Sequence, residues 1–142
     1  MAESPSVLIA AETLAPELRA LLDAAALVRE RAYAPYSRFL VGAAVEAASG
    51  QVYVGANVEN ATYGATICAE RSAVTRMVAD GDRELVRVAV YTEAEEPAMP
   101  CGICRQVISE FGRDVTIVTA TPAGVRVVTL AELFPHPFTL KP

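Results

Sequence analysis

The sequence lacks any apolar run close to the ~20 residues that a helix needs to cross a bilayer. Its first eleven residues also lack the basic region and the cleavage-site pattern of a secretory signal. From these two absences we expect a soluble, cytoplasmic protein with no membrane partner.

Basic clusters are missing as well. The 12 Lys and Arg residues are outnumbered by 17 Asp and Glu residues, which gives a formal net charge of -5. Arg29 and Arg31 come nearest to a cluster, and Glu30 separates them. Proteins that bind nucleic acids usually carry a basic patch that displaces counterions from the phosphates. We therefore expect a small-molecule substrate and no nucleic acid polymer as a partner.

Cysteine and histidine are scarce. The single histidine, His136, lies in a proline-rich segment and is given no role. Three cysteines are an odd number, which does not suit a disulfide framework. In a reducing compartment, spaced cysteines more often bind a metal or take part in chemistry.

The order of predicted elements indicates one α/β domain over residues 1–142, a length that suits a single core. Residues 1–12 are expected to form a loose tail. Apolar periodicity and the prolines at 16 and 35 predict a helix within 14–33. We expect further helices at 66–80, 101–111 and 130–134, and strands at 39–47, 51–56, 85–92, 115–120 and 124–128.

The first two strands are predicted to form a hairpin around Ser49-Gly50, and a polar loop follows at 57–64. Gly81 and Gly112 are expected to end two of the later helices. Because strands and helices then alternate, we expect parallel β-α-β crossovers with the antiparallel hairpin at one edge of the sheet.

Two short segments carry the candidate chemistry, Cys68-Ala69-Glu70 and Pro100-Cys101-Gly102-Ile103-Cys104. Each lies at the predicted start of a helix, and such starts meet at the carboxyl edge of an α/β sheet. Catalytic Zn²⁺ takes three protein ligands and keeps a fourth position open for water, and no fourth candidate ligand is nearby. We predict that Cys68, Cys101 and Cys104 bind one Zn²⁺.

The two residues after Cys68-Ala69 have candidate roles at that metal. Glu70, on the first helical turn, can approach the open position and move protons as a general acid and base. Arg71 can donate to the sulfurs and offset the net charge of −1 that three thiolates leave on Zn²⁺. This pattern matches the signature of zinc nucleobase deaminases, with cysteine in place of histidine.

Each of these residues also has a plainer interpretation. An isolated cysteine is most often a small core residue, a lone C-x-x-C motif also suits redox chemistry, and Arg71 suits a solvated helix face. The combination of Pro100, the C-x-x-C pair, Cys68 and Glu70 favours the metal site.

Five segments together resemble the small cytidine deaminases. They are Ala34-Pro35-Tyr36-Ser37-Arg38-Phe39-Leu40-Val41-Gly42-Ala43-Ala44, Asn57-Val58-Glu59-Asn60-Ala61-Thr62-Tyr63-Gly64, Cys68-Ala69-Glu70-Arg71, Pro100-Cys101-Gly102-Ile103-Cys104-Arg105-Gln106 and the closing Leu133-Phe134-Pro135 with Phe138. The resemblance runs from about Leu14 to Phe138. It implies a homotetramer, a three-layer α/β/α sandwich with a five-stranded mixed sheet, and hydrolysis of cytidine or deoxycytidine to uridine or deoxyuridine plus ammonia, as in pyrimidine salvage.

The resemblance also implies substrate-binding residues. Phe39 would pack against the pyrimidine, Asn57 and Glu59 would hydrogen-bond the ribose 3′-hydroxyl, and the N–H of Ala69 would hold the base carbonyl. Tyr63 and Phe138 would approach the site of a neighbouring subunit. Taken alone, Phe39 also suits the core, and Asn57 also suits a turn.

Two features depart from the family pattern. Met99 stands where the family often has serine, and the loop at 93–98 is acidic and contains a proline. Both lie beside the cysteine pair, so they bear on substrate choice. The alternatives are a deaminase of a related nucleoside such as blasticidin S, a deaminase acting on tRNA or DNA, a non-catalytic zinc-folded binding module and a thiol–disulfide protein.

Overall fold

Short apolar segments rich in alanine and β-branched residues form the five strands of one mixed sheet. The computed structural model describes residues 7–142. Its strands are β1 (Gly42–Ala47), β2 (Val52–Ala56), β3 (Leu85–Tyr91), β4 (Thr116–Thr121) and β5 (Gly124–Thr129). They lie in the order β2-β1-β3-β4-β5, so β2 and β5 are the edges.

The strand directions differ in part from the expected crossovers. The predicted hairpin is present as β1–β2, but β1 also pairs antiparallel with β3 and so lies between β2 and β3. Among the strands of residues 7–142, only β3 and β4 are parallel neighbours. A second hairpin, β4–β5, forms the other edge. Its connection is too short for a crossover, which needs a dozen or more residues.

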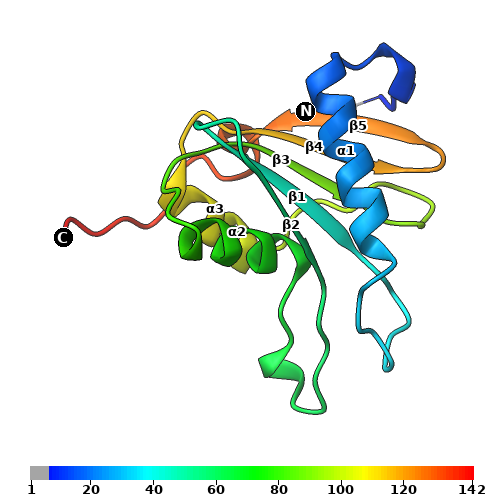
Figure 1. Ribbon diagram of the computed structural model, residues 1–142, viewed down its shortest axis with the longest axis horizontal. Helices are drawn as coiled ribbons and strands as arrows, with labels where there is room; N and C mark the ends of the chain where they lie inside the picture. The colour runs from blue at the N-terminus through cyan, green and yellow to red at the C-terminus, as the bar shows by residue number, and fades with distance from the viewer. Residues whose placement is uncertain (1–6) are drawn as a thin grey trace.

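Helices cover both faces of the sheet, as Figure 1 shows. The first helix, α1 (Pro16–Arg29), packs on one face, and α2 (Ala69–Ala79) and α3 (Gly102–Phe111) pack on the other, with the short α4 (Leu130–Leu133) beside α3. Because alternate strand residues point to opposite faces, Ala89 packs under α1 while Val88 packs under α2 and α3. This confirms the α/β/α sandwich with a five-stranded mixed sheet.

The elements begin and end close to their expected limits. α1 ends at Arg29, before the predicted limit of 33, and α2 begins only after Cys68, which is its N-cap residue. Residues 1–6 of the expected tail lie outside the described residues. The tail does not extend over the rest of 1–12, because the N–H and carbonyl groups of Ile9 both bond to Val125 on β5.

Two glycines let helices approach the sheet more closely than any side chain allows. A Cβ atom on Gly42, at the start of β1, would lie 1.9 Å from the carbonyl oxygen of Ala25 in α1. A Cβ atom on Gly55, in β2, would lie 2.5 Å from the backbone nitrogen of Ala73 in α2. The end of α1 and the first turns of α2 are therefore fixed against the sheet. Within residues 7–142, no helix combines the length and apolarity that crossing a membrane requires.

Candidate functional site

The beginnings of α2 and α3 bring the three cysteines together. Cys68 and Cys101 are the N-cap residues of these helices, and Cys104 lies on the first turn of α3. Their Sγ atoms all lie within 4.8 Å of one another, and those of Cys68 and Cys101 are 3.8 Å apart. All three are free thiols.

This sulfur cluster fits a tetrahedral zinc ion. A Zn–S distance of about 2.3 Å with tetrahedral angles places two sulfurs about 3.8 Å apart, which is the separation between Cys68 and Cys101. Thiolates are also a donor type that zinc prefers. Within the described part of the chain, no other group of three or more Cys, His, Asp or Glu side chains converges in this way.

The surroundings of Cys68 favour its thiolate form. The hydrogen bond shared with Cys104, and further contacts from Arg71 and Cys101, lower the pKa of Cys68 to about 5 against the opposing effect of burial. The same shared hydrogen bond, together with burial, raises the pKa of Cys104.

Arg71 lies behind the cluster. Its Nη2 atom donates to Sγ of Cys68 at 3.5 Å and to the carbonyl oxygen of Thr66 at 3.3 Å. These two bonds orient the guanidinium group toward the sulfurs and tie it to the loop that precedes α2. Its buried Nε atom has no partner among residues 7–142, so the guanidinium keeps a further donor in this region.

Glu70 lies on the first turn of α2 and is only 5% exposed. Burial raises the pKa of its carboxyl group to about 7, and the negative charge of Cys68 acts in the same direction. A carboxyl group with a pKa near neutrality can both accept and return a proton, as a general acid and base must. The position and the pKa of Glu70 therefore suit proton transfer beside the sulfurs.

A pocket of about 230 Å³ opens in front of these groups, with Cys68, Glu70 and Cys101 at its inner end. Its walls are mostly apolar. Phe39 and Val41 come from the segment before β1, and Ala98 and Met99 come from the loop after β3. The structure thus brings Phe39 and Met99 to the same pocket as the candidate metal ligands and Glu70. The apolar walls of this pocket suit a flat ring.

Asn57 and Glu59 both bond to the segment at 36–41, which precedes β1. Asn57 is buried at the pocket, where its Nδ2 atom donates to the carbonyl oxygen of Phe39 and its Oδ1 atom accepts from the N–H of Val41. Glu59 accepts from Ser37 Oγ and from the N–H groups of Tyr36 and Ser37 in the same segment. The Ser37 hydroxyl holds the pKa of Glu59 below its usual value. Between Asn57 and Glu59, Val58 forms isolated bridges to Tyr33 on one side and to Ile67 on the other.

The remaining predicted contacts lie around the pocket or away from it. Ala69 is fully buried at the pocket and, as the first residue of α2, has an N–H group without a partner in its own helix. Tyr63 and Phe138 do not line the pocket, and they are 78% and 67% exposed. Tyr63 packs edge-on against Tyr36.

Two supporting residues were given no role by the sequence reasoning. Arg105 donates to the carbonyl oxygens of Pro100 and Leu133, at 2.7 and 2.8 Å, and so ties the cysteine loop to α4. Gln106 donates to the carbonyl oxygen of Phe138 at 2.9 Å. Both residues directly follow Cys104 in the sequence. Their polar side chains, in a helix expected to be buried beside the candidate site, were the signal that could have pointed to a supporting role.

Comparison with known proteins gives a consistent picture. Residues 16–121 match the model of the cytidine and deoxycytidylate deaminase zinc-binding region. A cytidine deaminase of Halalkalibacterium halodurans is 44% identical over 121 residues, which cover 84% of this chain and 92% of that protein. One from Sporosarcina psychrophila is 45% identical, with coverage of 78% and 83%.

Solved structures agree with these relatives. The crystal structure of cytidine deaminase from Burkholderia pseudomallei is 45% identical, covers 84% of this chain and 97% of its own, and has a TM-score of 0.80. That from Mycobacterium tuberculosis is 39% identical, with coverage of 85% and 96% and a TM-score of 0.74. The zinc-binding region and the sulfur cluster together confirm the predicted zinc cofactor.

Proposed function

The chain belongs to the family of cytidine and deoxycytidylate deaminases, and we therefore propose that it hydrolyses cytidine or 2′-deoxycytidine to the uridine nucleoside and ammonia. The observation that carries this function is the convergence of three cysteine sulfurs and the buried carboxyl group of Glu70 at the inner end of one apolar pocket. A non-catalytic zinc module has no use for a buried carboxyl group beside its metal ligands, because burying it unpaired is unfavourable.

Each residue at the inner end of the pocket has a role in this reaction. Cys68, Cys101 and Cys104 hold the zinc ion, which when bound lowers the pKa of a water molecule toward neutrality. Glu70 would accept one proton from the attacking water and pass it to N3 of the base while the water oxygen bonds to C4. Glu70 would then take the second proton of that oxygen and pass it to the exocyclic amine, so that the C4–N bond breaks and ammonia leaves. Arg71 donates to the sulfurs and limits the negative charge at the site.

Substrate recognition uses the pocket walls. Phe39 packs on one face of the pyrimidine, and the N–H of Ala69 holds the base carbonyl. Asn57 and Glu59 bind the ribose 3′-hydroxyl with the hydrogen-bonding capacity that their contacts within the chain leave free. This capacity is the second N–H of Asn57 Nδ2 and a lone pair on Glu59 Oε2.

The protein acts on this substrate in the cytoplasm as a homotetramer. A reducing compartment keeps the three thiols available for zinc. Tyr63 and Phe138, both largely exposed in the single chain, complete the sites of neighbouring subunits.

Ultraviolet assays of amine loss test the function directly. We expect turnover of cytidine and deoxycytidine, little with adenosine, cytosine or blasticidin S, and loss of activity with a chelator that zinc restores. Activity on blasticidin S alone would favour the related-nucleoside alternative. No turnover of any of the five compounds by zinc-loaded protein would contradict the proposal.

Glu70→Gln separates proton transfer from metal binding. The amide keeps the size of the side chain but cannot carry the proton, so turnover should fall by roughly 100- to 10,000-fold. Zinc content measured on the same sample should stay at one ion per chain. Near-normal turnover in this variant would rule out the role given to Glu70.

A further inference from the structure

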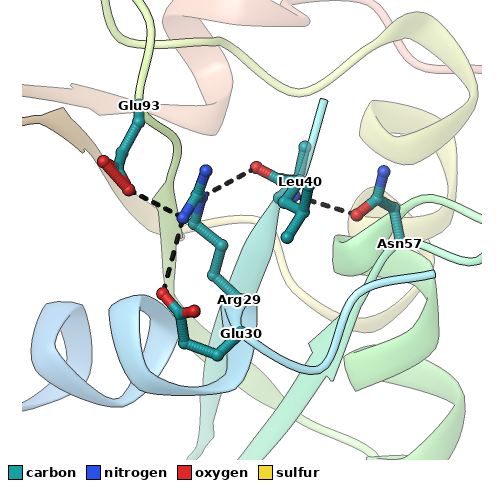
Figure 2. Close-up of polar contacts among 6 residues, drawn as sticks. Arg29, Glu30, Leu40, Asn57 and Glu93 are labelled. Atoms are coloured by element: carbon teal, nitrogen blue, oxygen red, sulfur yellow. Dashed lines mark hydrogen bonds and ion pairs between the residues drawn. The ribbon is translucent and has the colours of Figure 1, made fainter. Parts of the chain in front are cut away.

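Arg29 stands at a junction of three segments, as Figure 2 shows. It is the last residue of α1, and its side chain is only 13% exposed. Its Nε atom donates to the carbonyl oxygen of Leu40 at 3.0 Å, and its Nη1 atom donates to Oε1 of Glu93 at 2.8 Å. Oε1 of Glu30, whose side chain is largely exposed, lies 3.6 Å from the same Nη1 atom.

The two main partners of Arg29 lie in the two segments that supply walls of the nucleoside pocket. Leu40 lies between the wall residues Phe39 and Val41. Glu93 begins the loop that supplies Ala98 and Met99 to the other wall. A single planar guanidinium group therefore links the backbone of one wall to the first residue of the loop that forms the other.

The first wall is held from its other side by Asn57. Its Nδ2 atom donates to the carbonyl oxygen of Phe39, and its Oδ1 atom accepts from the N–H of Val41, the residues on either side of Leu40. Figure 2 draws the bond at Oδ1. With Arg29 bonded to Leu40, three consecutive residues are fixed through their backbone groups. The loop of the second wall is held by two ion pairs. Glu96 pairs with Arg126 on β5 at 3.7 Å, and the shorter pair of Glu93 with Arg29, at 2.8 Å, fixes the start of the loop.

The sheet brings these segments within reach of Arg29. Gly42 pairs with Tyr91, which places the start of β1 beside the end of β3 just before Glu93. A Cβ atom on Gly42 would lie 2.8 Å from the backbone nitrogen of Arg29. The missing side chain at Gly42 therefore lets the end of α1 lie directly over the point where both walls begin.

We propose that Arg29 is a positioning residue that sets the width of the nucleoside pocket by holding the Phe39–Val41 wall and the Glu93–Met99 loop at a fixed separation. The inference rests on the proposed deaminase function. Met99 directly precedes Pro100 and Cys101, so its side of the pocket adjoins the sulfurs where the reacting amine must lie. Arg29 thereby controls discrimination at the exocyclic amine of the substrate.

The chemistry of the contact requires arginine. A guanidinium group presents several N–H donors in a rigid plane, so one side chain can bond a carbonyl and a carboxylate in fixed directions. Lysine at this position would keep the charge but would not hold both partners with the same geometry. A purely electrostatic role would leave Arg29→Lys like the wild type, whereas the positioning role would not.

The test compares Arg29→Ala, Arg29→Lys and Glu93→Gln with the wild type on cytidine and on N4-methylcytidine. We expect KM for cytidine to rise roughly threefold to tenfold in Arg29→Ala, with kcat changed by no more than about twofold. Preference for cytidine over the methylated substrate should fall at least about threefold, since one methyl group is rejected by the fit of the pocket. Arg29→Lys and Glu93→Gln should show the same changes in part.

Glu95→Gln is the matched control, because it makes the same charge change in the same exposed loop without contacting Arg29. It should retain wild-type KM and preference. Zinc content should stay at one ion per chain in every variant. Equal KM and preference in all variants, or equal effects of Glu93→Gln and Glu95→Gln, would overturn the proposal.

Hydrogen–deuterium exchange gives a measurement that needs no turnover. In Arg29→Ala and Glu93→Gln, exchange should increase at residues 93–99, and in Arg29→Ala also at 39–41, while α2 stays protected. Unchanged exchange in both segments would overturn the positioning role. If the wild type deaminates no pyrimidine nucleoside, the proposed function fails, and the exchange result still decides whether Arg29 holds the two walls.

Discussion

Arg71 is the residue whose contribution to the site depends least on the substrate. Its contacts with Cys68 and Thr66 orient one ligand and leave one buried N–H donor beside the sulfurs. Residues that bond to metal ligands in this way usually change metal affinity by roughly 10- to 100-fold when removed. Removal of Arg71 should therefore weaken zinc retention more than it weakens substrate binding.

We predict that Arg71→Ala weakens zinc retention by roughly 10- to 100-fold in competition with a chromogenic chelator. KM for cytidine, measured with excess zinc, should change little because Arg71 does not line the pocket. Arg76→Ala is the control, since Arg76 is an exposed arginine of the same helix that pairs only with Asp80 within the described residues. Equal zinc retention in the Arg71 variant and the wild type would remove Arg71 from the metal site.

At the level of single residues, the sequence predicted best where chemistry restricts the choice. Cys68, Cys101, Cys104 and Glu70 could be located because thiolates and a carboxylate at helix starts have few other uses together. The hydrogen-bond partners of Asn57 and Glu59 within the chain could not be predicted, because Phe39 and Ser37 lie about twenty positions earlier. Arg29 could be given no structural role for the same reason, since its partner Glu93 is 64 positions away.

Among the elements, the contact between β2 and α2 does most to position the catalytic residues. Gly55 lies so close to α2 that a Cβ atom there would be 2.6 Å from the carbonyl oxygen of Ala69 and 2.5 Å from the nitrogen of Ala73. Both are backbone atoms, which cannot rotate away as a flexible side chain would. The first turns of α2, which carry Ala69 and Glu70, are therefore fixed by the absence of a side chain at Gly55.

Gly55→Ala should destabilise the protein by about 1–3 kcal/mol, because the added methyl group forces β2 and α2 apart. Chemical denaturation measures this loss, and kcat of the folded fraction should fall as Glu70 shifts. Gly64→Ala is the matched control, since a Cβ atom at Gly64 would meet nothing within 4 Å. A Gly55 variant as stable and active as the Gly64 variant would contradict this account of the contact.

The helices and strands themselves were well predicted, because their periodicities differ clearly. Which strands pair with one another was not. The sequence predicts strands at 39–47 and 51–56 that form a hairpin, yet nothing local shows that the first of them also pairs with β3. That pairing depends on which strand fits beside β3 once α1 covers one face. The β4–β5 hairpin at the far edge also depends on a turn at 122–124 that the sequence reasoning did not interpret.

For the whole molecule, the distribution of exposed apolar side chains bears on assembly. Val52 and Val54, on the edge strand β2, are 45% and 43% exposed, and Tyr63 and Phe138 are more exposed still. Single exposed apolar residues are ordinary, but large aromatic ones near a pocket are common at interfaces. Phe138 is held in place by Gln106 through its carbonyl oxygen, which leaves its ring free to reach outward.

If Phe138 completes the site of a neighbouring subunit, two inactive variants should restore each other. Phe138→Ala keeps Glu70 but lacks the aromatic ring, and Glu70→Gln keeps the ring but cannot transfer protons.

After the two proteins are denatured and refolded together with zinc, mixed tetramers contain sites with Glu70 from one chain and Phe138 from another. We expect their activity at low cytidine to exceed clearly the summed activities of the separately refolded variants, with light scattering reporting tetramers. Leu27→Ala removes an apolar side chain from α1 that is more exposed than Phe138, 77% against 67%. It should neither lose activity nor restore any in mixtures with Glu70→Gln. Activity equal to the sum would mean that Phe138 acts only within its own chain, and monomers at assay concentrations would contradict the tetramer itself.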